Sequence, residues 1–420
     1  MRFLLQGFGS RGDVQPMIEL GKGLLAAGHD NVAVAAWLDF EPMITKAGLQ
    51  FEPYHLGQEQ LLAAGQVQRW IKATDSETRA TRLQGAFLAS VAPVIAQDLL
   101  RMVQPGDVTI NGLLAADPMA TLAQHRGATA ISALFCPLLP TRSATSFMAP
   151  AIPKDSLINK IWSTFAMMVY AGYGDPVAQR VRAELGLKKR TRRDYLRALT
   201  RTPTLLAVSP AVAPPAPDWP KTQVQTGWWA RRTPADYQPP AELADFLAAG
   251  DPPVYLSFGS MSVAAADPAA EARLAVEALT DAGCRGLLDR GLLNHDLGDL
   301  PDTVLAISDV PHDWLFPRCA AVVHHGGSGT TGAAMGAGVP ALVVPHIGDQ
   351  MYFARRTHAL GCGPAPIRRH ELAVTNLSGS IRAMLTNDVM RQRATRLGHN
   401  VHAEDGVRSA VRQIEAWLTR

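Results

Sequence analysis

With 420 residues and a mass of 45.1 kDa, the chain is too long for one domain of ordinary size and suits two. Hydrophobic residues make up 47% of it, which argues against intrinsic disorder, and the formal net charge of +3 does not point to a nucleic-acid partner. No C-x-x-C motif occurs, so neither a zinc site nor a disulfide framework is expected from the cysteines, Cys136, Cys284, Cys319 and Cys362.

Scattered cysteines fit the reducing cytoplasm, which is the expected location of the protein. No signal peptide is expected, because Met1 to Leu5 run directly into a glycine loop. No uninterrupted apolar stretch reaches the length of a membrane span. The longest runs from Ile161 to Tyr173 and contains Ser163 and Thr164.

Strands alternate with helices in the first third of the chain. Phe3 to Gly7 is predicted as a buried parallel strand, followed by a helix with Pro16 near its start and Gly28 as its C-terminal cap. Val32 to Trp37 is predicted as the second strand. Later strands of the same sheet are predicted at Val108 to Ile110, Ala130 to Phe135 and Leu205 to Val208.

Eight prolines between positions 210 and 240 break this alternation, and the segment is interpreted as an inter-domain linker. The alternation then restarts. The predicted elements are strands at Val254 to Phe258, Val304 to Ile307, Ala321 to His324 and Ala341 to Val344, and helices at Ala269 to Ala282 and Ala410 to Leu418. The pattern predicts an α/β fold with domains at 1–209 and 241–420, facing each other across a cleft. Docking of the last helix on the N-terminal domain is left open.

The segment from Gly7 to Pro16 has two incompatible interpretations. By spacing, Gly7, Gly9 and Gly12 form the G-x-G-x-x-G of a dinucleotide-binding loop, and Asp39 could then bind a ribose. By chemistry, the loop delivers the carboxylate of Asp13 to the first turn of a helix. The second interpretation is favoured for two reasons. Asp39 lies farther along the chain from the glycines than the ribose-binding acid of the fingerprint does, and the dinucleotide interpretation leaves the later motifs without a role.

A second constellation, from His324 to Gly332, follows a strand and opens a helix. Its glycines allow close backbone approach, and free N–H groups at the helix start would bind a diphosphate. Gly259-Ser260 after another strand would add backbone donors. Asp349 and Gln350, beyond the strand that ends at Val344, could bind sugar hydroxyls, although Asp349 could also cap the next helix.

Four motifs occur in an order that resembles a known family. They are Gly9-Ser10-Arg11-Gly12-Asp13-Val14-Gln15-Pro16, Val310-Pro311-His312-Asp313-Trp314-Leu315-Phe316-Pro317, His324-His325-Gly326-Gly327 and Gly348-Asp349-Gln350. Together they resemble the family 1 glycosyltransferases of the GT-B fold, most closely the branch of sterol glucosyltransferases and bacterial natural-product glycosyltransferases. The resemblance covers almost the whole chain and implies two facing Rossmann-like domains.

The resemblance implies a role for each motif. Asp13 would be the catalytic base, Val310 and His312 would contact the nucleobase, and Asp349 and Gln350 would bind the transferred sugar. The donor diphosphate would be bound by Ser10, Arg11, Gly259, Ser260, His325, Gly327, Ser328, Gly329 and Thr330. Plant-type members place a tryptophan under the base where this chain has Asp309, so uracil and thymine both remain open.

The expected reaction is inverting transfer of a hexose from a UDP- or TDP-sugar to a hydroxyl of a lipophilic acceptor, such as a sterol or a polyketide. A free Asp has a pKa of about 3.9, so Asp13 would act as a general base while the new bond forms. The chain contains no D-x-D, so no metal is expected, and the nucleotide sugar is a co-substrate. The alternatives are an NAD(P)-dependent oxidoreductase and a non-catalytic nucleotide-sugar-binding helper.

Two further segments carry weaker signals. Lys188, Lys189, Arg190, Arg192 and Arg193 form a basic cluster, interpreted as a solvated helix face or as a transient contact with an anionic membrane. The stretch from 135 to 173 is rich in large apolar residues. It is either helix core or an acceptor pocket lined by Phe147, Trp162, Phe165 and Met168.

Overall fold

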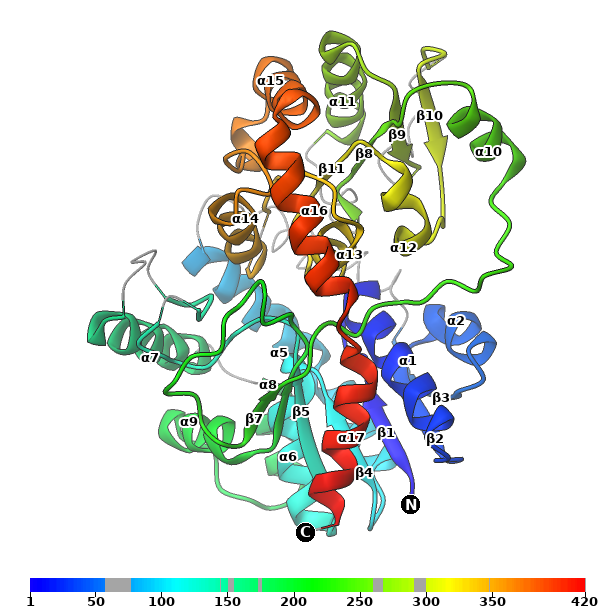
Figure 1. Cartoon of the computed structure of the whole chain (residues 1–420). Coiled ribbons are helices and arrows are strands. Elements are labelled where there is room, and N and C mark those ends of the chain that lie inside the picture. The colour runs from blue at the N-terminus through cyan, green and yellow to red at the C-terminus, as the bar shows by residue number, and fades with distance from the viewer. Residues whose placement is uncertain are drawn as a thin grey trace. The chain divides into compact units, whose positions relative to one another are not determined.

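The computed structural model describes residues 1–56, 77–143, 145–149, 155–172, 176–259, 267–290, 300–346 and 348–419. The chain divides into two compact units. Unit 1 comprises Met1–Trp229 and Asp405–Arg420, and unit 2 comprises Ala230–Glu404. Each unit has one all-parallel β-sheet with helices around it (Figure 1).

Unit 1 holds a seven-stranded sheet in the order β3-β2-β1-β4-β5-β6-β7. Its strands are β1 (Phe3–Gln6), β2 (Val32–Trp37), β3 (Gln50–Tyr54), β4 (Val108–Asn111), β5 (Thr129–Leu134), β6 (Thr204–Leu206) and β7 (Gln223–Gln225). The strand order reverses between β1 and β4, where open parallel sheets bind ligands beyond the carboxyl ends of their strands. The loop after β1 and the first turn of the following helix, which carries Asp13, therefore lie at this switch point.

Three helices of unit 1 have a proline in their interior, namely Pro16, Pro93 and Pro118. Its helices are α1 (Arg11–Ala26), α2 (Glu41–Lys46), α5 (Glu77–Met102), α6 (Leu113–Arg126), α7 (Leu157–Gly172), α8 (Pro176–Glu184), α9 (Arg192–Arg201) and α17 (Gly406–Leu418), with a 3-10 turn at Leu38–Phe40. Within α5, Arg82–Met102 is long and apolar enough to cross a membrane, a feature that a core helix of a soluble protein shares. This helix packs against β3, α6 and α8.

Unit 2 holds a five-stranded sheet in the order β10-β9-β8-β11-β12. Its strands are β8 (Val254–Ser257), β9 (Gly286–Asp289), β10 (Val304–Ile307), β11 (Ala321–His324) and β12 (Ala341–Val343). Its helices are α10 (Ala241–Ala248), α11 (Pro268–Ala282), α12 (His312–Leu315), α13 (Ser328–Ala337), α14 (Gln350–Ala359), α15 (Val374–Thr386) and α16 (Asp388–His402), with 3-10 turns at Phe316–Arg318 and Arg369–Glu371. Here the order reverses between β8 and β11, so the loops after these strands share one edge.

The core of unit 2 lies on both faces of its sheet. Successive residues of β8 alternate between two apolar clusters, with Leu256 in one and Tyr255 in the other. Helices α11 and α15 contribute to the first cluster, through residues such as Leu279 and Leu377. This two-sided burial explains why the strands are almost continuously apolar in sequence.

The structure differs from the sequence-based domain boundaries in two places. The segment 210–240, predicted as linker, contains β7, which pairs with β6 in the sheet of unit 1. The change of unit falls between Trp229 and Ala230. Helix α17 belongs to unit 1 and packs against α1, as Figure 1 shows for the red and dark blue helices. The prolines of this segment therefore lie in the connections before and after a short strand, and the segment is not one long linker.

Helix α1 also starts earlier than predicted. It begins at Arg11, so Pro16 lies inside the helix instead of in its first residues. The start is set by Ser10, which is the N-cap and has an extended backbone. Gly28, with φ of +96°, follows the C-cap residue as predicted for the end of this helix. Starting at Arg11 places Asp13 in the first turn.

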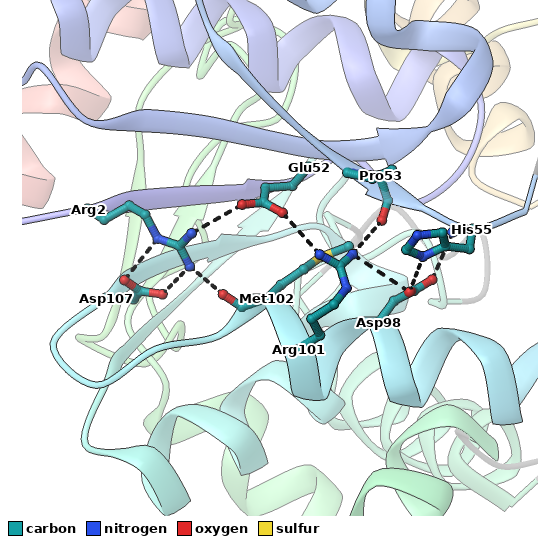
Figure 2. A network of polar contacts seen from close by, with 8 residues as sticks. All are labelled: Arg2, Glu52, Pro53, His55, Asp98, Arg101, Met102 and Asp107. Atoms are coloured by element: carbon teal, nitrogen blue, oxygen red, sulfur yellow. Dashed lines mark hydrogen bonds and ion pairs between the residues drawn. The ribbon is translucent and has the colours of Figure 1, made fainter.

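Charged side chains tie α5 to the strands of unit 1 (Figure 2). The network contains Arg2, Glu52, His55, Asp98, Arg101 and Asp107, with the carbonyls of Pro53 and Met102. Arg2 donates to Asp107 at 3.1 and 2.7 Å and to Glu52 at 3.2 Å. Asp98 accepts from the backbone N–H of His55 at 2.8 Å and contacts its ring at 2.5 Å. The bidentate contact between Arg2 and Asp107 fixes the entries to β1 and β4.

Candidate functional site

The loop after β1 holds the Asp13 carboxylate against a helix start. The backbone N–H of Ser10 donates to Asp13 Oδ2 at 2.8 Å, and the Ser10 hydroxyl donates to the same oxygen at 3.2 Å. The second carboxylate oxygen, Oδ1, takes no part in these two bonds. A Cβ at Gly9 would lie 2.2 Å from Oδ2, and Gly9 has φ of +147°. Glycine at position 9 is therefore a requirement of this carboxylate position.

The environment of Asp13 changes its acidity. Burial raises the pKa of the Asp13 carboxyl to about 6, whereas the hydrogen bonds from Ser10 act in the opposite direction. The carboxyl is thus a stronger base than a free Asp and is still mostly ionised at neutral pH. A general base is most effective when its pKa lies near the working pH. This environment suits proton transfer.

A cluster of three aromatic side chains supports the loop after β1. Trp37, the last residue of β2, donates its indole N–H to the Gly9 carbonyl at 2.7 Å. Phe8, Trp37 and Tyr54 pack together with ring centroids 4.9 to 5.3 Å apart. All three residues are at least 95% buried. Sequence reasoning missed this support, and a signal for it was available, since two neighbouring strands both end in a large aromatic residue.

The same geometry bears on Ser10, Arg11 and the dinucleotide interpretation. Both donors of Ser10 bond within the loop to Asp13, while Arg11 is exposed. The chain's own carboxylate thus occupies the helix start where a pyrophosphate would have to bind, and two anions repel each other there. Gly12 is exposed, and a Cβ on it would meet only Ser10 Oγ at 3.5 Å. It does not serve close helix–strand packing, so the fingerprint is a match of spacing alone.

In unit 2, glycines hold the ring of His325 between two loops. A Cβ on Gly259 would lie 3.0 Å from His325 Cε1, and one on Gly327 would lie 2.6 Å from His325 Nε2. Gly259 follows β8 and Gly327 precedes α13, so the imidazole sits where the two switch-point loops meet. Ser260 lies outside the described residues. The structure thus brings together the predicted Gly259, His325 and Gly327.

Three histidines near this edge are neutral. Burial lowers the pKa of His324 and His346 to about 3 and that of His325 to about 4. His324 Nδ1 accepts from the Gly326 N–H at 3.0 Å, so its proton lies on Nε2. His346 Nδ1 lies 2.7 Å from the Val344 carbonyl and donates to it, so its Nε2 is an acceptor.

One nitrogen of each ring has no hydrogen-bond partner within the described part of the chain. These atoms are His324 Nε2, His325 Nδ1 and His346 Nε2. Buried polar atoms are nearly always satisfied in folded proteins, so unsatisfied nitrogens gathered at one edge are typical of a site that receives a ligand. Sequence reasoning found His325 but gave no role to His346.

The first turn of α13 presents backbone donors. The N–H groups at the start of an α-helix have no partner within the helix, and the helix dipole makes this end positive. Ser328, Gly329 and Thr330 form this turn. At Gly329 a Cβ would meet nothing within 4 Å. The hydroxyl of Thr331, by contrast, donates to the Gly327 carbonyl at 2.9 Å and is used within the helix.

The predicted sugar-binding pair lies at the start of α14. Asp349 is the N-cap residue, yet its side chain makes no capping hydrogen bond, so the structure does not support the capping interpretation. Gln350 is buried, and its Oε1 accepts from the His346 N–H at 2.7 Å. Gly326, with φ of +93°, lets this helix approach, since a Cβ there would lie 3.1 Å from the Gln350 carbonyl. The α14 start is thereby fixed beside the histidine loop.

The predicted nucleobase segment follows β10. Asp309 has φ of +54°, a left-handed conformation that is rare outside glycine and often marks functional loops. It precedes Val310, which is partly exposed. The His312 ring stacks on Phe316 with centroids 4.4 Å apart, and its Nε2 lies 3.5 Å from the Tyr255 hydroxyl. The positions of Asp349, Val310 and His312 do not by themselves test their predicted roles.

The predicted acceptor residues do not form a buried core. Trp162 and Phe165 on α7 are 54% and 55% exposed, while Phe147 and Met168 are half-buried. The interpretation of this stretch as ordinary helix core is wrong for the two aromatic residues, because core packing would have covered them. In the described ranges, no group of three or more His, Cys, Asp or Glu residues could hold a metal ion.

The chain is similar to known proteins both in a C-terminal segment and over nearly its whole length. Residues 288–416 match a family described as "Erythromycin biosynthesis protein CIII-like, C-terminal domain". The chain is 32% identical over 416 residues to the sterol 3-beta-glucosyltransferase UGT80B1 of Arabidopsis thaliana, covering 96% of this chain and 66% of that protein. It is 31% identical over 432 residues to a sterol 3-beta-glucosyltransferase of Saccharomyces cerevisiae, covering 98% of this chain. The chain thus spans about two thirds of the plant relative and 35% of the yeast one.

Solved structures show the same fold. The glycosyltransferase of kitacinnamycin matches with a TM-score of 0.70 at 21% identity, covering 99% of this chain and 98% of that one. The calicheamicin glycosyltransferase CalG4 matches with a TM-score of 0.69 at 18% identity, over 100% and 99%. VinC, solved in complex with dTDP, matches with a TM-score of 0.66 at 22% identity, over 99% of each chain. These are GT-B proteins with two Rossmann-like domains, and the two parallel sheets described above have that architecture.

Proposed function

Because the chain belongs to the GT-B glycosyltransferases related to the sterol glucosyltransferases, we propose that it transfers a hexose from a nucleotide sugar to a hydroxyl of a lipophilic small molecule. The observation that carries this proposal is the Asp13 carboxylate, held by Ser10 at the switch point of unit 1 with its pKa raised to about 6. A binding protein has no need of a basic carboxylate in this position.

Unit 2 would bind the donor. The diphosphate would accept hydrogen bonds from the first N–H groups of α13, from the hydroxyls of Ser328 and Thr330, and from the ring of His325. The His325 imidazole is neutral, with its pKa lowered to about 4, so it would act as a dipolar donor and not as a cation. Neutral donors that are already in place can stabilise the charge that develops on a leaving diphosphate. We therefore expect no metal to be required.

Asp13 would accept the proton of the attacking hydroxyl. As the acceptor oxygen forms its bond to the anomeric carbon, its proton moves to Asp13 Oδ1, and the bond from that carbon to the diphosphate oxygen breaks. The nucleoside diphosphate leaves with the electron pair of the broken bond. Attack opposite the leaving group inverts the configuration at the anomeric carbon. Ser10 would keep Oδ2 in place while Oδ1 changes its protonation state.

The donor and the acceptor are proposed by class. The relatives are named sterol 3-beta-glucosyltransferases, which supports glucose as the sugar and a sterol-like acceptor. VinC and SsfS6 were solved with thymidine diphosphates, which supports TDP-sugars as the alternative donors. The protein would then modify either sterols or a polyketide-like product. Asp349 and Gln350 would contact the sugar, and the hydrogen bond from the His346 N–H to Gln350 Oε1 would orient the Gln350 amide.

A thermal-shift panel of UDP, TDP, GDP, NAD and NADP, each with and without EDTA, tests the proposal. A ligand at one hundred times its Kd stabilises by about 2.7 kcal/mol, which gives a readable shift. We expect stabilisation by UDP or TDP that EDTA does not change. Stabilisation by NAD or NADP alone would instead support an oxidoreductase. Without acceptor, an enzyme that uses Asp13 would slowly hydrolyse the nucleotide sugar. A helper protein would bind the nucleotide sugar and leave it intact.

A further inference from the structure

Helix α7 of unit 1 has its apolar and polar faces reversed. Five large apolar residues are between 54% and 67% exposed: Leu157, Ile158, Ile161, Trp162 and Phe165. The polar residues Asn159 and Ser163 of the same helix are 0% exposed. Asn159 donates to the Arg142 carbonyl at 2.9 Å, and Ser163 donates to the Asn159 carbonyl at 2.6 Å, so both buried side chains donate to backbone carbonyls. A helix that only completes a core has the opposite arrangement.

The exposed residues form one continuous face. At about 100° per residue, they fall within an arc of about 140°. Met168 and Val169, both half-buried, fall within the same arc. The rings of Trp162 and Phe165 lie side by side, with centroids 6.3 Å apart. We call the residues Leu157, Ile158, Ile161, Trp162 and Phe165 the α7 ridge. Contiguous exposed apolar surface of this kind usually marks an interaction site.

Basic residues surround the neighbouring helix. Helix α9 packs against α7 and carries exposed arginines on its outer side. The exposed cations of this segment are Lys188, Lys189, Arg192, Arg193, Arg197 and Arg201. Arg190, which the sequence grouped with them, pairs instead with the buried Asp117 and belongs to the interior. Burial lowers the pKa of Arg190, while its neighbours act in the opposite direction.

Few carboxylates offset these charges. Asp194 is the one acidic residue between Lys188 and Arg201, and it lies 3.6 Å from Arg197. Asp155 is exposed just before α7. Asp218 faces the other side of α7, where it pairs with Lys160 at 3.0 Å. The segment therefore remains strongly cationic beside an apolar ridge.

We propose that the α7 ridge and the α9 cations dock unit 1 on an anionic lipid bilayer. Apolar side chains would enter the boundary between headgroups and acyl chains, and the flanking arginines and lysines would attract anionic headgroups. The proposal goes beyond sugar transfer, because it concerns where the chain meets a lipophilic acceptor, and its binding test needs no donor or activity. A second copy meeting through the same surface would bring like charges together, which disfavours it.

Vesicle co-sedimentation of the full chain tests this proposal. The vesicles would be phosphatidylcholine alone and phosphatidylcholine with 30% phosphatidylglycerol, at low and high salt. We expect binding to the anionic vesicles that weakens with salt. The double variant Ile158→Asp/Ile161→Asp should bind about tenfold less, because two aliphatic side chains no longer enter the bilayer. Val389→Asp, at an equally exposed apolar residue on α16 of unit 2, should bind like the wild type.

A charge-reversal pair separates the two contributions. Arg193→Glu/Arg197→Glu should lose the preference for anionic vesicles, whereas Arg412→Glu, at an exposed arginine on α17, should keep it. Thermal unfolding checks the fold of every variant, and the charge-reversal pair remains informative if the aspartate pair does not fold. The proposal is overturned if the wild type does not bind anionic vesicles or if the ridge variant binds equally well. It is also overturned if the ridge variant abolishes a concentration-dependent dimer, which would assign the ridge to a second copy.

Discussion

The Asp13 carboxylate can hold its position only because residue 9 is a glycine and has no side chain. A Cβ at position 9 would lie 2.2 Å from Asp13 Oδ2 and 2.6 Å from Asp13 Cγ, so either the loop or the carboxylate must move. The Gly9 carbonyl also accepts the Trp37 indole N–H, which holds the loop from the other side. At the residue scale, the position of the Asp13 carboxylate is therefore determined by a neighbour that has no side chain of its own.

Gly9→Ala should reduce transfer by about a hundredfold or more, because a base moved by 1 Å loses its geometry. Donor affinity should remain, since the donor loop is in unit 2. Gly48→Ala is the matched control: Gly48 also has positive φ, +76°, but a Cβ there meets nothing within 4 Å. Steady-state kinetics of both variants should show full activity for Gly48→Ala. Equal loss in both would mean that backbone strain, and not the carboxylate, is responsible.

The acidity of Asp13 sets an expected pH dependence. In the proposed mechanism the ionised carboxylate is the active form, and its pKa is raised to about 6, so kcat/KM should fall about tenfold per pH unit below pH 6 and level off above it. Asp13→Asn should lose transfer at all pH values and keep nucleotide-induced thermal stabilisation. A wild-type profile that stays flat down to pH 4.5 would contradict a raised pKa at the base.

Helix α13 has a glycine, Gly329, that the fold itself does not require. It lies where the proposed diphosphate would bind. Gly329 lies in the first turn of a right-handed helix, and a Cβ there meets nothing. Gly329→Ala should leave the protein as stable or more stable by up to ~1 kcal/mol, because alanine favours helices. It should nevertheless weaken UDP or TDP binding about tenfold or more, since the methyl group would stand where the diphosphate approaches.

Gly336→Ala is the control within the same helix. There a Cβ would make an ordinary contact of 3.5 Å with Val401, so stability should change in the same direction while nucleotide affinity is unchanged. Isothermal titration of both variants with UDP and TDP measures the difference. Unchanged affinity in Gly329→Ala would remove the diphosphate from the start of α13.

The histidines at the ends of β11 and beyond β12 should make unit 2 sensitive to acid. The pKa values of His324 and His346 in the folded chain, about 3, lie below the ordinary value of 6.5. As the pH falls, these histidines are therefore protonated in the unfolded chain at a higher pH than in the folded chain. The stability is complete above pH 6.5 and is lost as the pH falls toward 3, by about 1.4 kcal/mol per pH unit for each such group.

His346→Phe tests this dependence, because phenylalanine keeps the ring that packs on Phe258 and cannot be protonated. Its unfolding free energy should fall less steeply between pH 7 and pH 5 than that of the wild type. His402→Phe, at an exposed histidine of α16, should leave the wild-type slope. Equal slopes in all three proteins would show that His346 becomes protonated in the folded state.

Elements with strong apolar patterns could be predicted from the sequence, and short polar ones could not. The strands at Val304–Ile307 and Ala321–His324 have their predicted bounds because turn residues flank buried apolar runs. Strand β7 was missed, because Gln-Val-Gln between prolines lacks any strand pattern. The α7 ridge could not be recognised either, since a core helix and an exposed apolar helix have the same composition.

The same limit applies to the candidate site. Asp13 could be singled out by its position after a glycine loop at a helix start. Its raised pKa could not, because the burial that raises it arises only in the folded chain. The hydrogen bond between His346 and Gln350 could not be predicted either, because it depends on where the start of α14 lies relative to the segment after β12. Local motifs locate chemical groups, whereas burial and partners require the fold.

At the scale of the whole molecule, α17 closes unit 1 although unit 2 separates it in the chain from the rest of that unit. Val407 lies against Gly23 of α1, and His29 contacts Glu415 at 3.1 Å. Ile414→Ala should destabilise unit 1 by about 2–5 kcal/mol, because Ile414 is fully buried. Glu415→Ala should cost less than about 1 kcal/mol, as a partly exposed pair does.

Calorimetry with and without UDP or TDP can assign these changes. We expect Ile414→Ala to lower the unfolding temperature of unit 1 while nucleotide still raises that of unit 2. A single transition that nucleotide shifts as a whole, in the wild type and in the variant, would show that the two units unfold together.

The split of unit 1 has a consequence for synthesis on the ribosome. The residues of unit 2 form one uninterrupted segment, so all of its strands are available once residue 404 has left the exit tunnel. Helix α1, by contrast, is translated before unit 2 and can pack against α17 only after unit 2 has been translated. Throughout that interval Gly23 of α1 lacks its contacts with Val407 and Val411 of α17. Unit 1, which bears Asp13, is therefore completed only after all of unit 2 has been translated, and a chain stalled before α17 would carry the complete unit 2 beside an incomplete unit 1.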